Sequence, residues 1–272
     1  MLAQRVATAL IGVPAILALI AWGGTLAFSI ALGAVLAAAV LEFFAATDPA
    51  PSGRSRILAP RPPALLGVAA VALLVAAAHN GTDWSSGALA LAIALIFGLL
   101  ILQGDTGAGL RDWMWATGGV VYVGFLGSHL VLLRHLEDGR DWVLLAILAI
   151  WATDTAAYFV GRTLGRIHLT PNISPRKTLE GSLAGLIGGF GSVLLINWLI
   201  GPNVDLADIL PIALLLPLVA QIGDLAESLI KRSAGVKDTG AIFPGHGGFL
   251  DRLDSILFAA PLVYYLVIWV IL

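Results

Sequence analysis

The residues best suited to chemistry lie in one short stretch of the chain, from Ser228 to Asp254. The stretch is polar, although long apolar runs flank it on both sides. It combines basic side chains, carboxylates and one histidine with a glycine-rich turn: Lys231, Arg232, Lys237, Arg252, Asp238, Asp251, Asp254, His246, Gly247 and Gly248. Charges of both signs are costly at the edge of a membrane, so their presence there indicates a site for a charged substrate.

Acidic residues within or beside the apolar runs are the candidates for binding a metal ion. They are Asp154, Asp224, Glu227, Asp251 and Asp254. A spacing of three residues places Asp224 and Glu227 on one helix face, and the same spacing relates the last two acids. Carboxylate oxygens are the ligands that Mg²⁺ prefers. We therefore predict a magnesium site, with room for a second cation, that uses Asp224, Asp251 and Asp254.

A structural role for these acids remains open at this stage. They would then pair with the basic residues of the same stretch at helix ends. Asp154 suits a hydrogen bond to a neighbouring hydroxyl group as well as it suits a metal site, and Glu227 is undecided between the two roles. Glu42, near the end of the second apolar run, is interpreted as a side chain that reaches the membrane interface.

The glycine-rich turn F-P-G-H-G-G-F permits positive φ angles and exposes backbone N–H groups. Such turns cradle phosphate oxygens, and this turn leads into a helix whose N-terminus favours an anion. Its position between Lys237 and Arg252 predicts a nucleotide phosphate site, with the amides of Gly247 and Gly248 as donors. His246 contacts a phosphate, relays a proton or makes only a structural hydrogen bond.

A second polar loop, T-P-N-I-S-P-R-K-T-L-E-G, is predicted to face the same side of the membrane. Ser174 followed by Pro175 is typical of a helix start. Four side chains of this loop are candidates for binding a further phosphate group: Ser174, Arg176, Lys177 and Thr178. Attraction to anionic lipid headgroups would explain the two bases equally well.

The composition indicates a membrane protein. Of 272 residues, 59% are hydrophobic and 12% are charged, and the mean hydropathy is +0.95. Soluble domains carry about 25% charged residues, so this chain lacks the polar surface that water requires. The net charge of −2 gives no reason to expect a nucleic-acid partner. The absence of cysteine rules out disulfides and thiolate metal sites.

We predict an all-α polytopic fold with about nine transmembrane helices, because each crossing needs roughly 20 apolar residues. The predicted spans are Val6–Trp22, Leu26–Ala46, Pro63–His79, Gly87–Gln103, Thr117–Leu133, Trp142–Gly161, Gly181–Ile200, Asp208–Ile230 and Leu253–Leu272. The first is interpreted as a retained helix and not as a signal peptide.

One integrated membrane domain is expected, in which residues 1–116 form an N-terminal region and residues 117–272 form the catalytic region. Charges and tryptophans over Gly104–Ala116 predict a short interfacial helix before the fifth span. With nine spans, Arg134 and Arg140 fall on one side of the membrane and the remaining Lys and Arg on the other. The positive-inside rule then places the N-terminus and the predicted site on the cytoplasmic side and the C-terminus outside. We expect the membrane to be a bacterial-type inner membrane.

The order of residues from Ser228 to Asp254 resembles the signature of phosphatidate cytidylyltransferases, the CDP-diacylglycerol synthases. The matching pattern is S-x-x-K-R-x-x-x-x-K-D-x-G-x-x-x-P-G-H-G-G-x-x-D-R-x-D. The fragments S-P-R-K-T-x-E-G from Ser174 and D-T-x-A-Y from Asp154 resemble that family as well. The resemblance implies Mg²⁺-dependent transfer of CMP from CTP to phosphatidic acid, which gives CDP-diacylglycerol and pyrophosphate in phospholipid biosynthesis. It also implies a homodimer among membrane lipids.

This interpretation assigns a role to each candidate residue. The catalytic set is Asp224, Asp251, Asp254, Lys231, Arg252 and His246. The substrate-binding set is Ser174, Arg176, Lys177, Thr178, Ser228, Arg232, Lys237, Asp238, Gly247 and Gly248. Two other functions remain open. A CTP-dependent lipid kinase of the dolichol-kinase type would transfer the γ-phosphate, and an ion-coupled transporter would hold its site near the middle of the membrane.

Overall fold

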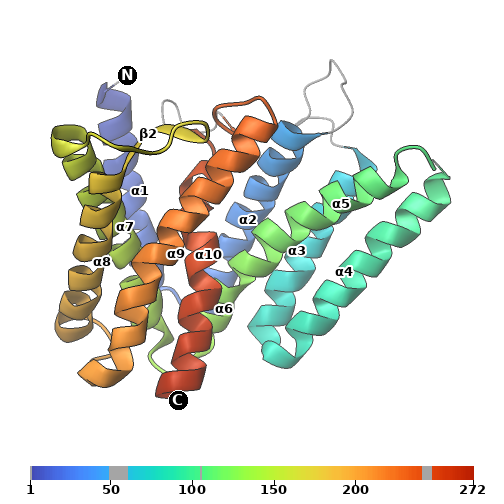
Figure 1. Ribbon diagram of the computed structural model, residues 1–272. Helices are drawn as coiled ribbons and strands as arrows, with labels where there is room; N and C mark the ends of the chain where they lie inside the picture. The colour runs from blue at the N-terminus through green and yellow to red at the C-terminus, as the bar shows by residue number, and fades with distance from the viewer. Residues whose placement is uncertain (1, 49–60, 105, 241–246) are drawn as a thin grey trace. The chain divides into compact units, whose positions relative to one another are not determined.

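The structure is a computed structural model that describes residues 2–48, 61–104, 106–240 and 247–272 (Figure 1). It divides into two compact units. The first comprises Met1–His135 and Ser233–Leu253, and the second comprises Leu136–Arg232 and Asp254–Leu272. The predicted division of the chain at residue 116 stays a prediction.

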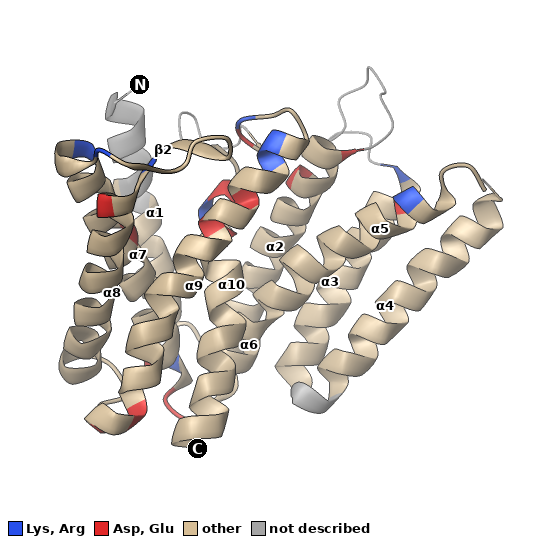
Figure 2. Cartoon of the chain, viewed as in Figure 1, with Lys and Arg blue, Asp and Glu red and all other residues tan. Residues whose placement is uncertain are grey.

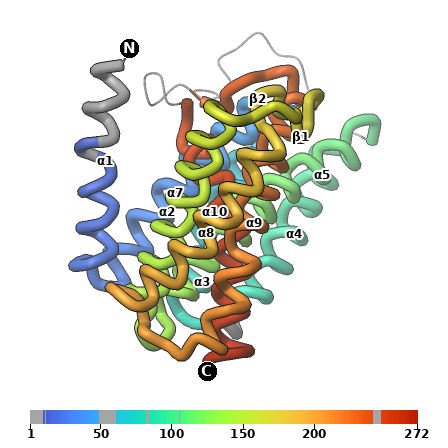
Figure 3. The backbone as a smooth tube through the Cα atoms, turned by 60° about the vertical axis from the view of Figure 1, so that its left-hand side comes forward, coloured from blue at the N-terminus to red at the C-terminus, as the bar shows by residue number. Residues whose placement is uncertain are grey.

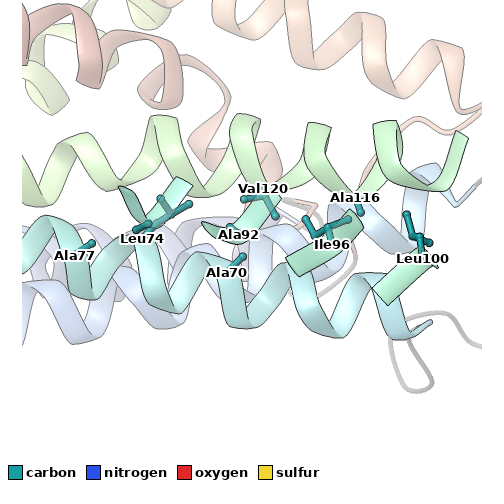
Figure 4. Close-up of a cluster of buried hydrophobic side chains, with 9 residues drawn as sticks. Ala70, Leu74, Ala77, Ala92, Ile96, Leu100, Ala116 and Val120 are labelled. Carbon is teal, nitrogen blue, oxygen red and sulfur yellow. The ribbon is translucent and has the colours of Figure 1, made fainter. Parts of the chain in front are cut away.

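The first unit is built from helices that pack through small side chains. Its elements are α1 (Leu2–Trp22), α2 (Thr25–Thr47), α3 (Pro62–Asn80), α4 (Thr82–Gln103), α5 (Gly109–Gly119), the π-helical turn η1 (Val120–Phe125) and α6 (Leu126–His135). A buried cluster joins α3 and α4 to the α5–η1 segment (Figure 4): Ala70, Leu74, Ala77, Ala88, Ala92, Ile96, Leu100, Ala116 and Val120. Alanines at these contacts let the helix backbones approach closely, which is the main source of helix association in lipid.

A long helical stretch replaces the interfacial helix predicted over Gly104–Ala116. The structure continues α5, η1 and α6 without interruption from Gly109 to His135, so that prediction is wrong. The stretch contains no proline, and Gly119, two residues after the predicted start of the fifth span at Thr117, keeps a helical φ of −63°. Asp112 in its first turn is buried and forms an ion pair with Arg61, so this charge is neutralised within the protein.

The second unit contains α7 (Gly139–Leu164), the strands β1 (His168–Thr170) and β2 (Ser174–Thr178), α8 (Leu179–Leu199) and most of α9 (Leu206–Ser233). It ends with the greater part of α10 (Leu250–Leu266) and the π-helical turn η2 (Val267–Ile271). Helices α7 and α8 lie side by side, and the antiparallel β1–β2 hairpin connects them at one end (Figures 1 and 3).

Glycines spaced by four residues along α8 explain why α7 and α8 approach so closely. A methyl group on Gly181 would lie 2.8 Å from the Ala157 carbonyl oxygen, and one on Gly185 would lie 3.2 Å from the Thr153 carbonyl oxygen. Backbone of α7 therefore occupies the space that side chains would fill. This is the small-residue packing expected of membrane helices.

The start of α8 differs from the prediction at Ser174–Pro175. Those residues open strand β2, and the helix begins only at Leu179. The Oγ1 atom of Thr178 accepts the N–H of Gly181 at 3.2 Å, so Thr178 is the N-cap residue. Antiparallel pairing with β1 keeps Ser174–Thr178 extended, and this partner cannot be recognised from local capping signals.

The helices identify a polytopic membrane protein, as predicted. In the part of the chain that the structure describes, eight helices are long and apolar enough to cross a membrane. They correspond to the second to ninth predicted spans, with the fifth lengthened to Gly109–His135. Helix α3 carries no charged residue, and α8 carries only Glu180, in its first turn (Figure 2). The first predicted span coincides with α1, and its membrane crossing, like the orientation of the termini, stays a prediction.

Candidate functional site

A cavity of about 670 Å³ lies in the second unit, lined by residues of α7, the β-hairpin, α8 and α9. Its charged and ionisable lining residues are Asp154, Arg162, His168, Arg176, Lys177 and Asp224. A volume of about 300–1,000 Å³ is typical of small-molecule sites. Ordinary ligand sites carry few polar groups, so this density of charge favours a charged ligand such as a phosphate ester.

The most direct contact in the cavity joins Lys177 to Asp224. Strand β2 carries Lys177, and pairing with β1 fixes the direction of that strand. The ammonium group forms an ion pair with the Asp224 carboxylate on α9. The two side chains are 27% and 31% exposed, so the pair contributes little to stability by itself. Its effect is to place a positive and a negative group side by side in the cavity wall.

Carboxylates from three helices interact near this pair. Asp154 on α7 interacts electrostatically with Asp224 and Lys177. Asp254 on α10 interacts with both of these acids and with Lys231. Three nearby carboxylates repel one another, and a bound cation would remove that repulsion. This grouping brings together two of the three predicted metal ligands and adds Asp154, whose role the sequence left open.

The metal site itself stays a prediction. Within residues 2–48, 61–104, 106–240 and 247–272, no group of three or more His, Asp or Glu side chains has an arrangement that could hold a metal ion. The donor atoms nevertheless suit Mg²⁺, because all three acids of the cavity region offer hard carboxylate oxygens. Asp251, the third predicted ligand, belongs to the first unit.

In the first unit, Asp251 ties together the two sides of the glycine-rich turn. Its Oδ2 atom accepts three hydrogen bonds, from the N–H and the hydroxyl group of Thr239 (3.1 and 3.0 Å) and from the N–H of Gly248 (2.8 Å). Gly247 has a φ of 81°, which favours glycine. Asp251 thus has a structural role that the sequence did not reveal, and the amide of Gly248 donates to Asp251. Residues 241–246, which include the predicted catalytic His246, lie outside the described residues.

The comparison with known proteins decides the family. The model of the cytidylyltransferase family matches residues 3–270. This chain belongs to the cytidylyltransferase family. The match covers almost the whole chain, so it includes both units and all the candidate residues named above.

Several relatives carry the name phosphatidate cytidylyltransferase. The protein of Synechocystis sp. is 34% identical over 293 residues, which is 97% of this chain and 96% of that protein. The protein of Brucella suis is 42% identical over 171 residues, 61% of this chain and 60% of the relative. The Bacillus subtilis protein is 40% identical over 151 residues, 55% of this chain and 56% of the relative. The chain therefore spans about three fifths of the length of the Brucella relative.

The next group of predicted residues lies near the end of α9. Glu227 is buried and forms an ion pair with Lys231, one helical turn away. Arg232 donates from Nε to the carbonyl oxygen of Ile173 at 3.2 Å, which ties α9 to the β-hairpin. Ser228 lies one turn after Asp224 and is partly buried. The predicted phosphate contacts of Ser228, Lys231 and Arg232 stay predictions.

The remaining predicted residues fall into an exposed group and a structural group. Lys237, Asp238, Arg252 and Arg176 have exposed side chains, as ligands for a soluble nucleotide require. Thr178 is buried as the N-cap of α8, and Ser174 opens β2. Arg176 and Lys177 line the cavity, in agreement with a role in binding, although the ligand of these bases stays a prediction.

Three residues that also line the cavity were not predicted from the sequence: Gln221, Arg162 and His168. Gln221 donates from Nε2 to the carbonyl oxygen of Ser182 at 3.1 Å and so links α9 to α8. The sequence contained a signal for Gln221, because this amide lies three residues before Asp224 and therefore on the same helix face as Asp224. Arg162 donates to the hydroxyl group of Tyr158 at 2.7 Å, a helical spacing of four that was equally recognisable.

Proposed function

We propose that this protein is a phosphatidate cytidylyltransferase, which transfers CMP from CTP to phosphatidic acid and releases pyrophosphate. The observation that carries the proposal is the cavity in which Lys177 and Asp224 meet, in a chain that matches the cytidylyltransferase family over residues 3–270. The names of the relatives supply the lipid substrate. The signature from Ser228 to Asp254 agrees with both.

The chemistry asks mainly for positioning and charge neutralisation. An oxygen of the phosphatidate headgroup attacks the α-phosphorus of CTP, and the bond from that phosphorus to the bridging oxygen of pyrophosphate breaks. A phosphate monoester has its second pKa near 6, so the nucleophile is already anionic at neutral pH and needs no strong general base. Fixed cations that lie against the phosphates then supply most of the rate enhancement.

The residues of the cavity suit this task. Arg176 and Lys177 present two cations on the β-hairpin, and we assign them to the phosphatidate headgroup or the CTP phosphates. Four bases that do not line the cavity, Lys231, Arg232, Lys237 and Arg252, are assigned to the triphosphate and pyrophosphate. We assign the acyl chains to the membrane beside the apolar helices. Only the lipid headgroup then has to enter the site, and the chains never need to cross water.

Mg²⁺ is the proposed cofactor, held by Asp224, Asp254 and Asp251. When bound, it would neutralise charge on the phosphate oxygens. We further propose that the site faces the cytoplasm at a bacterial-type inner membrane, because the predicted topology gathers the Lys and Arg residues on that side. A homodimeric state is part of the same proposal.

The deciding experiment incubates the purified full chain in detergent micelles with phosphatidic acid, Mg²⁺ and CTP labelled in the cytosine ring. Cytosine label in the organic phase is the expected result, and a chelator such as EDTA is expected to abolish it. Label recovered as aqueous CDP, with phosphate transferred to a lipid, would identify a kinase instead. Absence of both products would contradict the proposal and leave transport as the function to test.

A further inference from the structure

Glu42 is a buried carboxylate that the proposed reaction does not use. It lies on α2, five residues before the end of the helix, and is 1% exposed. The interpretation of Glu42 as a side chain that reaches the membrane interface is therefore wrong. Burying a carboxylate is costly unless hydrogen bonds compensate for the lost water. The partners of Glu42 consequently indicate what this residue does.

The Glu42 carboxylate caps the N-terminus of α10. Its Oε2 atom accepts the N–H of Leu250, the first residue of that helix, at 2.9 Å. The N–H of Phe249 also hydrogen-bonds to the carboxylate. Amides at a helix start have no partner within the helix, and the helix dipole favours a negative charge there. A residue 208 positions away in the chain thus supplies the cap.

The same carboxylate packs against two glycines of the signature. A side chain on Gly240 or Gly248 would collide with the Glu42 carboxylate oxygens. A methyl group on Gly240 would also lie 3.0 Å from the Cα atom of Gly248, so these glycines are neighbours. Among the described residues, Gly247 has a positive φ, but Gly240 and Gly248 do not, so backbone conformation does not explain these two glycines. Lack of space beside Glu42 is the reason for glycine at both positions.

Thr239, Gly240, Gly248 and Leu250 form what we call the loop anchor, because two carboxylates hold them together. Asp251 bonds to Thr239 and Gly248, while Glu42 contacts the two glycines and caps Leu250. Lys237 lies two residues before the anchor and Arg252 two residues after it. Glu42, together with Asp251, therefore holds the backbone next to both of these bases.

We propose that Glu42 is a positioning residue, which holds the loop anchor so that Lys237 and Arg252 bind the triphosphate of CTP. The inference rests on the proposed function, because it takes these two bases as ligands of the nucleotide. Glu42 itself touches no substrate in this proposal. Its removal changes how tightly the nucleotide binds, and the lipid headgroup is left to other residues.

The first test compares Glu42→Gln with wild-type enzyme in steady-state kinetics. A charged hydrogen-bond acceptor is lost, and we expect KM for CTP to rise by at least about tenfold. KM for phosphatidic acid should stay within about twofold of the wild-type value, since the anchor does not bind the lipid. A merely structural role would lower the amount of active enzyme, and hence kcat, without changing KM for CTP. That outcome would overturn the proposal.

Two further variants serve as controls for this test. Glu137→Gln makes the same chemical change at an exposed position, and it is expected to leave both KM values unchanged. Glu42→Asp keeps the negative charge on a side chain one methylene shorter, so its KM for CTP should lie between those of wild type and Glu42→Gln. It also allows the test to be made if Glu42→Gln does not fold.

The second test needs no substrate and measures thermal unfolding in detergent. Gly248→Ala should lower Tm in the wild-type background, because its methyl group meets the Glu42 carboxylate. In the Glu42→Ala background the same substitution should have little further effect, since the obstructing group is gone. If the two substitutions lower Tm additively, the contact between Glu42 and Gly248 is absent and the proposal is overturned.

The two proposals can fail separately. If the wild-type protein shows no cytidylyl transfer, the proposed function and the role of Glu42 in nucleotide binding both fail. The Tm values of the two single variants and the double variant still decide whether Glu42 holds the anchor.

Discussion

Asp224 is the residue on which most of the site converges. It lines the cavity, pairs with Lys177 and interacts with both Asp154 and Asp254. One lysine paired with a carboxylate that also interacts electrostatically with two further acids leaves the group with excess negative charge, which a bound cation or a further basic side chain would neutralise. This imbalance is expected at a functional site and has no obvious value for folding.

Asp224→Asn should lower cytidylyl transfer by at least about 100-fold, because one of the carboxylates proposed to bind the cation loses its charge. The ion pair with Lys177 is partly exposed, so the free energy of unfolding should change by less than about 1 kcal/mol. Radiochemical turnover and thermal unfolding of the same preparation check both statements. Asp205→Asn, at an exposed position before the same helix, is the matched control and should retain full activity.

Asp251 allows its two possible roles to be separated. As a metal ligand it should set the Mg²⁺ concentration needed for half-maximal activity, whereas as a tie between Thr239 and Gly248 it should affect stability. Asp251→Asn is expected to abolish measurable turnover at low Mg²⁺ and to lower Tm, because three hydrogen bonds converge on the carboxylate. A titration of activity against Mg²⁺ in this variant is the measurement. An unchanged Mg²⁺ dependence would remove Asp251 from the metal site.

At the scale of the elements, the contact between α7 and α8 determines where the β-hairpin and its bases lie. The two helices meet along α8 glycines that leave no room for side chains, and the hairpin joins the ends of the pair. Glu180, in the first turn of α8, accepts the backbone N–H of Arg166 and that of Ile167 at 3.1 and 3.2 Å. These bonds fasten the end of β2 that enters α8 to the start of β1, close to Lys177 and its ion pair with Asp224.

Gly189→Ala should destabilise the protein by about 1–3 kcal/mol, because its methyl group would meet Thr153 and Pro217 at the crowded contact between helices. Gly191→Ala is the matched control on the same helix, where nothing lies within 4 Å of an added methyl group. Alanine favours a helix over glycine by about 1 kcal/mol, so this control should be neutral or stabilising. Thermal unfolding in detergent distinguishes the two. Equal effects would contradict the packing of α7 against α8.

At the scale of the whole molecule, the chain is a polytopic membrane protein whose charges are confined to few places. The predicted topology of nine spans puts the loop between α8 and α9 outside and the β-hairpin inside the cell. Exposed positions exist in both segments, at Asp205 and Asn172. The chain has no cysteine of its own, so a single introduced cysteine is the only thiol that a reagent can label.

Asp205→Cys should react with a membrane-impermeant maleimide added to intact spheroplasts, because its loop is predicted to be outside. Asn172→Cys should react only after the membrane is permeabilised. Labelling is read from the mobility shift of the purified protein, and denatured samples report the total thiol. The opposite pattern would invert the topology and place the proposed site outside the cytoplasm.

The sequence predicted most of the helices because crossing a membrane is a local requirement, met by about 20 apolar residues in a row. It was wrong over Gly104–Ala116, where α5 continues into η1 and α6 without a break. It was also wrong at Ser174–Pro175, where pairing with the distant strand β1 decides the structure. Among the site residues, Asp224 and Lys177 were recognised by type, but their contact joins segments that local patterns do not connect.

The amino-acid order alone determined the class of protein, its family resemblance and the residue types of the site, because hydropathy and motif spacing are properties of short segments. Only the tertiary structure decided which side chains meet. The role of Glu42 shows the reason: its carboxylate contacts glycines and a helix start about 200 residues later in the chain. Such a contact depends on how helices pack, and packing leaves no signal in the local sequence around Glu42.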